Sequence, residues 1–110
     1  MAKDYVEHRV VMGFISAPAD EAEGLAIKLV ESGLVACAQV TAGITSYYRW
    51  KGEVQRDAEV LIIIKSKLSL KQAIADFVEN EHSYDVPECV FVPAVGGVPA
   101  YLQWVGESTK

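Results

Sequence analysis

Two apolar stripes with helical spacing divide this chain into two halves of the same pattern. The first stripe runs through residues 22–30 and the second through residues 70–78, and in both the apolar side chains recur at i, i+3, i+4, i+7 and i+8. This spacing is typical of a helix that buries one face. Apolar, β-branched runs precede and follow each stripe, so each half is predicted to form a strand, a helix and a second strand.

The strand boundaries follow from apolar runs and from the turn residues between them. Gly43 marks a bend in the second strand. Lys51 and Gly52 form a tight turn that makes the second and third strands a long hairpin. His8 is interpreted as a residue at the edge of the first strand. The four predicted strands cover residues 7–15, 35–50, 53–65 and 88–95.

Polar residues at the starts of the stripes predict how the helices are capped. Ser16 is expected to be the N-cap of the first helix, with Pro18 in its first turn. Ser69 and Gln72 have the S-x-x-Q spacing of a capping box and are expected to cap the second helix. Residues 101–105 are expected to form a short last helix.

This order of elements predicts an α+β fold. Right-handed crossovers in both halves give the ferredoxin-like (βαβ-βαβ) arrangement, an antiparallel sheet with two helices on one face. The short C-terminal helix is added to this core. No linker or low-complexity stretch is visible, so residues 1–110 are expected to form a single domain.

The predicted strands are more apolar than is expected for a sheet that helices cover on one face only. Residues 10–15 and 60–64 are apolar at successive positions, where a sheet with one wet face alternates apolar and polar residues. A large apolar patch would therefore stay exposed on a monomer, which favours a homo-oligomer; the alternative is that the last helix, with Trp104, covers it. Glu59 and Lys65 flank the second run, and two interpretations stay open for them: a pair at a subunit boundary, or solvated strand ends.

Four aromatic residues are candidates for contacts between molecules. Tyr47, Tyr48 and Trp50 cluster at the hairpin tip, and Trp104 lies in the last helix. Tyr and Trp are over-represented at the energetic centres of protein interfaces, so Tyr47, Tyr48 and Trp104 are interpreted as interface anchors. The alternative for the hairpin tip is a platform on which a ligand stacks.

The composition narrows the classes of partner. Ten basic residues stand against fifteen acidic ones, a formal net charge of −5. Nucleic-acid binding depends on Lys and Arg, so nucleic acid is not an expected partner. No apolar run approaches the roughly 20 residues that cross a bilayer, and no signal-peptide pattern is visible. Cys37 and Cys89 are far apart and indicate reduced thiols. A cytoplasmic protein without membrane contact is expected.

Few residues have the spacing that catalysis or metal binding needs. His82 lies in the polar loop HSYDVPE and is either a metal ligand, an acid/base group in a cleft, or a histidine bonded to the backbone. Cys37 is a candidate soft ligand for copper, provided that the fold brings it near His82 from the same or a neighbouring chain. No nucleophile elbow, phosphate-binding glycine loop or H-E-x-x-H motif is present. The sequence favours a binding protein over an enzyme.

Five motifs, in order along nearly the whole chain, resemble those of the divalent-cation-tolerance (CutA) family. They are similar to the family's L-x-A-C-x, Y-x-W-x-G, E-V-x-x-x-x-K-T, H-P-Y-x-x-P-E and Y-L-x-W patterns. Some members carry a Cys where this chain has Phe14 and Ile15, and a His pair where it has Glu81 and His82. The five matching stretches are residues 34–38, 48–52, 59–66, 82–88 and 101–104.

The resemblance implies a homotrimer with the ferredoxin-like fold, similar in its core to the PII signalling proteins. It implies a role in the response to divalent metal ions, with copper(II) as the candidate ion and no catalysis. The alternative is a PII-like signalling or scaffold trimer that binds a small metabolite or a partner protein in its inter-subunit cleft. By this resemblance the residues near that cleft are Cys37, Trp50, Glu59, Lys65, His82, Tyr84 and Glu88.

Overall fold

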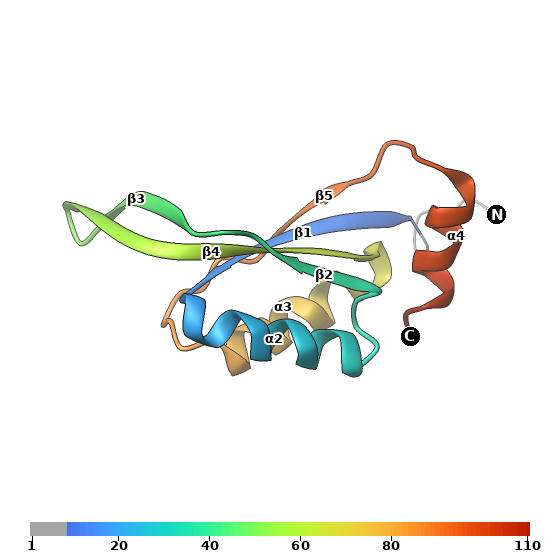
Figure 1. The fold of residues 1–110 in the computed structure, drawn as a ribbon, viewed down its shortest axis with the longest axis horizontal. Helices are drawn as coiled ribbons and strands as arrows, with labels where there is room; N and C mark the ends of the chain where they lie inside the picture. Colours follow the sequence, from blue (N-terminus) through green and yellow to red (C-terminus); the bar gives the residue numbers. More distant parts are fainter. Residues whose placement is uncertain (1–8) are drawn as a thin grey trace.

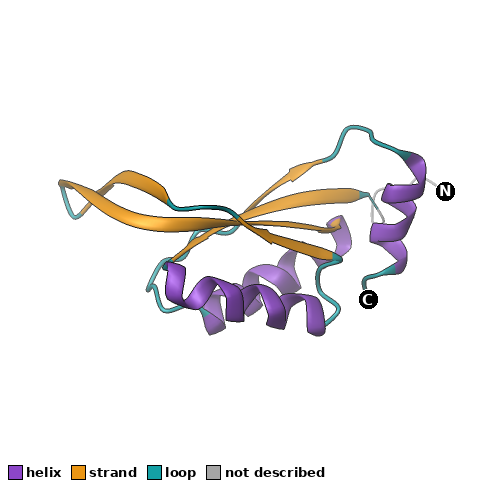
Figure 2. Ribbon diagram, in the orientation of Figure 1, coloured by secondary structure: helices purple, strands orange, loops and turns teal. Residues whose placement is uncertain are grey.

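The elements of the protein follow the predicted order of strands and helices. The computed structural model describes residues 9–110. Figures 1 and 2 show the sheet as one layer, α2 and α3 together on one side of it, and α4 at one end of the molecule. The elements are β1 (Val10–Ala17), α2 (Ala19–Glu31), β2 (Cys37–Val40), β3 (Ile44–Trp50), β4 (Glu53–Lys67), a 3-10 turn (Leu68–Leu70), α3 (Lys71–Glu81), β5 (Val90–Pro93) and α4 (Pro99–Glu107).

The sheet is antiparallel throughout the described residues, with the strand order β2-β4-β1-β5 and with β3 paired to the first half of β4. The predicted second strand is divided at Gly43 into β2 and β3, which both pair with the continuous β4. Counting β2 and β3 as one bent strand gives the ferredoxin-like order. The predicted fold class, with two helices on one face and a short C-terminal helix, is therefore confirmed.

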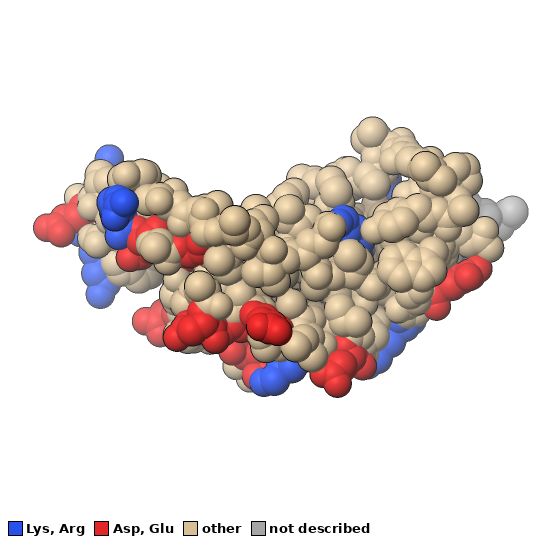
Figure 3. Space-filling view, in the orientation of Figure 1, with Lys and Arg blue, Asp and Glu red and all other residues tan. Residues whose placement is uncertain are grey.

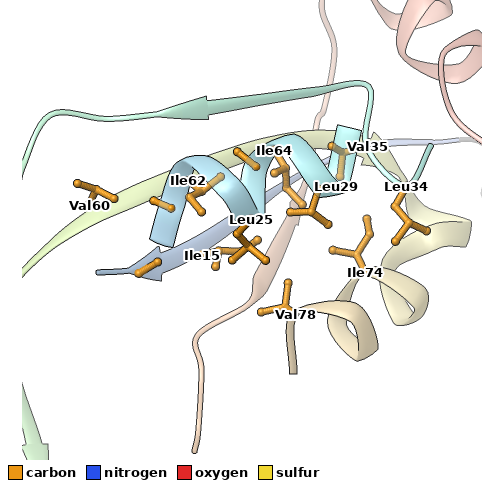
Figure 4. Close-up of a cluster of buried hydrophobic side chains, with 13 residues drawn as sticks. Ile15, Leu25, Leu29, Leu34, Val35, Val60, Ile62, Ile64, Ile74 and Val78 are labelled. Carbon is orange, nitrogen blue, oxygen red and sulfur yellow. The ribbon is translucent and has the colours of Figure 1, made fainter. Parts of the chain in front are cut away.

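The core lies between the sheet and the two helices. The predicted stripes supply it, because Leu25 and Leu29 of α2 and Ile74 and Val78 of α3 are all buried. Alternate residues of the central strands point to the same side, and Figure 4 shows them meeting the helices. Each large apolar side chain that is fully buried stabilises the fold by about 1.5–3 kcal/mol. The strand contributors are Ile15, Ala17, Val60, Ile62 and Ile64.

The opposite face of the sheet, which we call the open face, is also apolar. Val90 and Val92 on β5 are 53% and 39% exposed, and Phe14 beside them is half-buried. Leu61 and Ile63 of β4 are half-buried as well. The helix α4 contacts the sheet where β1 begins and β4 ends, at one end of the molecule, and it leaves Val90 and Val92 exposed (Figure 1). Figure 3 shows mostly uncharged side chains along the upper side of the molecule, away from α2 and α3.

The predicted helix caps are wrong. Ser16 is the seventh residue of β1, pairs with Leu61 and leaves Pro18 as the N-cap of α2. Ser69 lies inside the 3-10 turn, where it makes no cap, and Gln72 donates instead to Asp76 one helical turn later. Both serines have the right residue type and position for a cap, but the strand and the 3-10 turn extend over them.

The strand ends also differ from the predicted ones. β4 continues to Lys67, two residues beyond the expected end, and β5 is confined to Val90–Pro93. Residues 7 and 8 of the predicted first strand, including His8, lie outside the described residues. Among residues 9–110, no helix is long and apolar enough to cross a membrane.

The hairpin of β3 and β4 projects from the body of the molecule as an arm (Figure 1). Its turn is the predicted pair Lys51 and Gly52, with φ angles of 51° and 82°. Both residues have positive φ, as in the two-residue turns whose twist matches a β-hairpin. The arm carries Tyr47, Tyr48 and Trp50, and these residues form one wall of the pocket described below.

Candidate functional site

A pocket of about 530 Å³ opens between the hairpin arm and the loop that follows α3. Its residues come from four parts of the chain: the end of β1, β3, β4 and residues 84–88. We call it the aromatic–acidic pocket because aromatic rings and carboxylates make up most of its lining. The lining residues are Ser16, Ser46, Tyr47, Tyr48, Trp50, Glu59, Tyr84, Asp85, Val86 and Glu88.

Glu59 and Tyr84 meet at the inner part of this pocket. Glu59 is only 6% exposed, and the Tyr84 hydroxyl donates to its Oε2 at 2.8 Å. Burial raises the pKa of Tyr84, and the hydrogen bond to Glu59 and the charge of that carboxylate raise it further. The phenol is therefore a neutral hydrogen-bond donor at physiological pH.

His82 lies beneath the pocket and connects two of its walls. Its side chain is fully buried, with Nε2 2.8 Å from the Ser16 carbonyl oxygen. Its Nδ1 accepts the backbone N–H of Tyr84 at 3.0 Å, and the two rings pack with centroids 4.6 Å apart. Glu21 approaches Nδ1 at 3.6 Å. Both ring nitrogens therefore have partners within the chain, and neither points into the pocket as a free ligand.

Two further hydrogen bonds hold the acidic groups around the rim. Ser16 donates its hydroxyl to Glu88 at 3.2 Å, which ties the loop after α3 to the end of β1. The Tyr48 hydroxyl donates to Asp57 across the hairpin. This hydrogen bond raises the pKa of Tyr48, with smaller contributions from burial and from the charges of Asp57 and Glu59.

The charge of the pocket is negative. Glu59, Asp85 and Glu88 line it, and among residues 9–110 no Lys or Arg does. Arg56 lies nearby, but it stacks on Tyr47 with its guanidinium carbon 5.9 Å from the ring centroid and its Nε donating to the Tyr47 hydroxyl. Such a pocket attracts cations and repels anions, because the field of its carboxylates is concentrated between weakly polar walls.

With the fold and this pocket established, comparison with known proteins places the chain in a family. Residues 11–108 match the family described as CutA1 divalent ion tolerance protein. The chain belongs to the CutA1 family. It is 40% identical to the divalent-cation tolerance protein CutA of Thermus thermophilus, over 86% of this chain and 93% of that protein.

The longer relatives and the solved structures agree with this assignment. Identity is 39% to the mouse protein CutA, over 96% of this chain but 60% of the mouse protein, so the chain spans three fifths of that relative. The crystal structure of CutA1 from Oryza sativa superposes with a TM-score of 0.89 at 40% identity, covering 93% of this chain and 94% of that one. The Thermus thermophilus structure gives 0.89 at 37% identity, covering 92% and 99%.

The structure brings together most of the residues that the CutA motifs suggest for a cleft. Trp50, Glu59, Tyr84 and Glu88 all line the aromatic–acidic pocket, with His82 directly beneath it. Lys65 does not join them, because it follows Glu59 by six residues on the same strand. At about 3.3 Å per residue, the two are roughly 20 Å apart.

Cys37 lies with Lys65, away from His82. The two form a cross-strand pair on β2 and β4, and Lys65 donates to Gln39 beside it. Cys37 also adjoins Tyr101 of α4, whose pKa is raised chiefly by burial and further by Cys37. Within the described part of one chain, no three His, Cys, Asp or Glu side chains are grouped closely enough to hold a metal ion.

The remaining aromatic candidates divide between two regions. Tyr47 and Tyr48 line the pocket and are 67% and 42% exposed. Trp104 lies on α4, is 44% exposed and packs against Tyr101 with ring centroids 5.6 Å apart. The pocket also contains Ser16, Ser46, Asp85 and Val86, which the sequence did not indicate as site residues. Of these four, only Asp85 and Val86 could have been found from the sequence, because they lie inside the HSYDVPE motif.

Proposed function

We propose that the protein acts in divalent-cation tolerance as a cytoplasmic homotrimer that binds a divalent cation, such as copper(II), rather than catalysing a reaction. The observation that carries this proposal is the set of carboxylates Glu59, Asp85 and Glu88 around one pocket without a lining Lys or Arg. Carboxylate oxygens suit divalent cations, and a negative pocket raises their local concentration. Membership of the CutA1 divalent ion tolerance family supports the same role.

Within one chain these carboxylates do not form a complete ligand set, so the proposal includes a contribution from a second chain or from water. His82 and Cys37 remain the alternative ligands, with both nitrogens of His82 already engaged and Cys37 placed elsewhere on the sheet. A metal bound through His82 would have to displace the backbone of Ser16 or of Tyr84. The pocket carboxylates need no such rearrangement.

Calorimetric titration of metal-stripped protein with Cu(II) tests the ion and its ligands together. We expect a saturable site in the wild type that is lost in Glu59→Gln. It should be retained in Glu79→Gln, which removes one exposed negative charge outside the pocket. Loss in His82→Ala, with retention in Glu59→Gln, would move the ion to the histidine. Heat that never saturates in any variant would refute the metal part of the proposal.

The homotrimer is supported by the open face of the sheet. Val90 and Val92 are exposed there beside half-buried Phe14, and soluble monomers rarely leave contiguous apolar patches larger than a few hundred Å². Light scattering after size exclusion should give three times the chain mass, and Val92→Lys should lower it. A wild-type protein that stays monomeric would contradict the trimer without affecting the metal titration.

A second function is favoured by the size of the pocket. Its volume of about 530 Å³ falls within the roughly 300–1,000 Å³ of small-molecule sites and far exceeds the space that one ion fills. The alternative is therefore a PII-like signalling or scaffold trimer that binds a small metabolite or a partner protein there. A thermal-shift screen that finds a metabolite but no metal effect would favour this alternative.

A further inference from the structure

We propose that the aromatic–acidic pocket binds a small organic cation, an amine or quaternary ammonium group, with its positive charge against Glu59. This proposal rests on the second candidate function above, small-ligand binding in the pocket. It goes further by assigning the chemical class of the ligand. Three observations carry it: the burial of Glu59, the exposed aromatic walls, and the absence of positive charge from the lining.

The first observation is a buried carboxylate that lacks a positive partner among the described residues. Glu59 is 6% exposed, and its hydrogen-bond partner there is the phenol of Tyr84. Removing a carboxylate from water is unfavourable unless hydrogen bonds and an opposite charge compensate for the lost hydration. A neutral phenol supplies the hydrogen bond but no charge. A cation entering the pocket would supply the missing charge at the position where the potential is most negative.

The second observation is the amount of aromatic surface in the lining of the same pocket. Tyr48 and Trp50 are 42% and 43% exposed, yet both line the pocket and stand on the same side of β3. An ammonium or guanidinium group is attracted to the face of such rings. The chain already shows the interaction once, because the Arg56 guanidinium lies over the Tyr47 ring. Tyr48 and Trp50 have no comparable cation among the described residues.

The third observation separates an organic cation from the other ligand classes. An anionic metabolite would meet Glu59, Asp85 and Glu88 without a lining Lys or Arg to neutralise it. A bare metal ion gains little from aromatic walls and, within the described chain, needs water or a second chain to complete its ligands. An organic cation uses both parts of the lining, since its charge meets the carboxylates and its carbon groups contact the rings.

Three ligands of one shape and different charge test this inference. Choline is the cation, 3,3-dimethylbutan-1-ol its neutral isostere and 3,3-dimethylbutyrate an anion of similar shape. We expect choline to bind about tenfold more tightly than the neutral alcohol, and the anion not to bind. Binding is followed by NMR on the assembled protein through the indole N–H signals. Trp50 reports on the pocket, and Trp104 on α4 is the internal control.

Two carboxylate variants locate the charge recognition. Glu59→Gln keeps an acceptor for Tyr84, and we expect it to remove most of choline's advantage while leaving the neutral alcohol unaffected. Glu88→Gln, at the exposed rim, provides a second variant should Glu59→Gln fold poorly. Glu79→Gln on α3 makes the same change in net charge outside the pocket and should change nothing.

The outcomes distinguish this inference from the proposal on which it rests. Equal binding of choline and the neutral alcohol at Trp50 would refute charge recognition but keep the pocket as a ligand site. Preference for the anion would refute the organic cation as the class. If choline leaves Trp50 unmoved at millimolar concentration, the inference is wrong. A metabolite of another class found by the thermal-shift screen would then still support the second candidate function.

Discussion

The backbone N–H of Tyr84 donates to Nδ1 of His82, which determines the form of this buried imidazole. Because Nδ1 is the acceptor, the proton of the neutral ring is on Nε2, where it is donated to the Ser16 carbonyl oxygen at 2.8 Å. Ser16 and Tyr84 in turn hold the carboxylates of Glu88 and Glu59. His82 therefore positions two walls of the pocket from below rather than facing a ligand.

This arrangement predicts a large effect of His82 on stability. His82→Ala opens a cavity and leaves the Ser16 carbonyl and the Tyr84 N–H without partners, so we expect unfolding to become easier by about 2–4 kcal/mol. Ser83→Ala changes the exposed neighbour, whose side chain has no hydrogen bond among the described residues, and should stay within about 0.5 kcal/mol. Urea denaturation measures both. Equal midpoints would show that His82 does not hold the two walls together.

The same geometry predicts the nitrogen chemical shifts of the ring. In labelled protein, Nδ1 of the neutral His82 should have the shift of an unprotonated nitrogen and Nε2 that of a protonated one. Adding Cu(II) below saturation should leave these two signals less broadened than those of groups around Glu59. Selective loss of the His82 signals would instead identify the imidazole as the copper ligand.

Gly13 is the point of closest packing in the sheet. A Cβ atom at this position would lie 2.7 Å from Cγ1 of Ile64 and 3.0 Å from the ring of Phe91, its partners on the two neighbouring strands. Gly13→Ala should therefore destabilise the protein by about 1–3 kcal/mol, as overpacked cores do.

The control for this variant is Gly24→Ala on the exposed side of α2, where an added Cβ meets no atom of the described residues within 4 Å. Alanine is the better helix former, so this change should stabilise the protein by about 0.5–1 kcal/mol. Thermal and urea unfolding compare the two variants. If Gly13→Ala leaves the stability unchanged, the sheet relaxes around the added methyl group and the prediction is wrong.

The fold was predictable because its main signals are periodic. The helical stripes ending near Val30 and Val78, and the two-residue turn at Lys51 and Gly52, all have local causes that the residues themselves reveal. The caps were not predictable in this way. Ser16 looks like an N-cap, yet its pairing with Leu61 extends the strand, and its hydroxyl bonds to Glu88, 72 residues away.

The pocket, too, could be predicted only in part, because some of its residues belong to recognisable motifs and others are brought in by the fold. Trp50, Glu59 and Tyr84 were suggested by family motifs, and the fold brings them to one place. Lys65 was suggested by the same motif as Glu59 but lies farther along the extended strand, so the distance follows from strand geometry. Sequence alone could not place Ser16 in the pocket, because that contact depends on how the α3–β5 loop crosses the end of β1.

The raised pKa of Tyr84 predicts how stability depends on pH. The unfolded phenol titrates near its ordinary value of 10.0, and in the folded protein burial and Glu59 raise the pKa above that value. Above about pH 10 the folded protein keeps a proton that the unfolded chain releases. The stabilisation that Tyr84 provides is therefore fully present below the pKa of its phenol in the unfolded chain. The free energy of unfolding falls as the pH rises above that value.

Tyr84→Phe should make the alkaline decline in stability less steep. Part of the decline should remain, because the pKa values of Tyr48 and Tyr101 are also raised. At neutral pH the variant should be less stable by about 1 kcal/mol, because Glu59 loses its donor. Urea denaturation over an alkaline pH series measures both effects, with Tyr47→Phe as the matched change. An alkaline slope identical to that of the wild type would contradict the Tyr84–Glu59 interaction.

The turn of the hairpin arm gives a test of how firmly the arm is folded. Lys51 and Gly52 both have positive φ. A Cβ at Gly52 would meet no atom of the described residues within 4 Å, so a substitution there acts through the backbone. Gly52→Ala should destabilise the protein by about 1 kcal/mol. Lys51→Asn should instead stabilise it by a few tenths of a kcal/mol, since Asn-Gly is the preferred pair in such turns.

Both changes are measured by thermal unfolding together with the fluorescence of Trp50 at the end of β3. If the arm folds as one unit with the sheet, the two variants should shift the global transition in opposite directions. If Gly52→Ala changes the Trp50 signal while leaving the transition in place, the arm unfolds independently of the sheet. The aromatic wall of the pocket would then be formed only when a ligand or a second chain holds the arm, and ligand affinity should fall in Gly52→Ala and rise in Lys51→Asn.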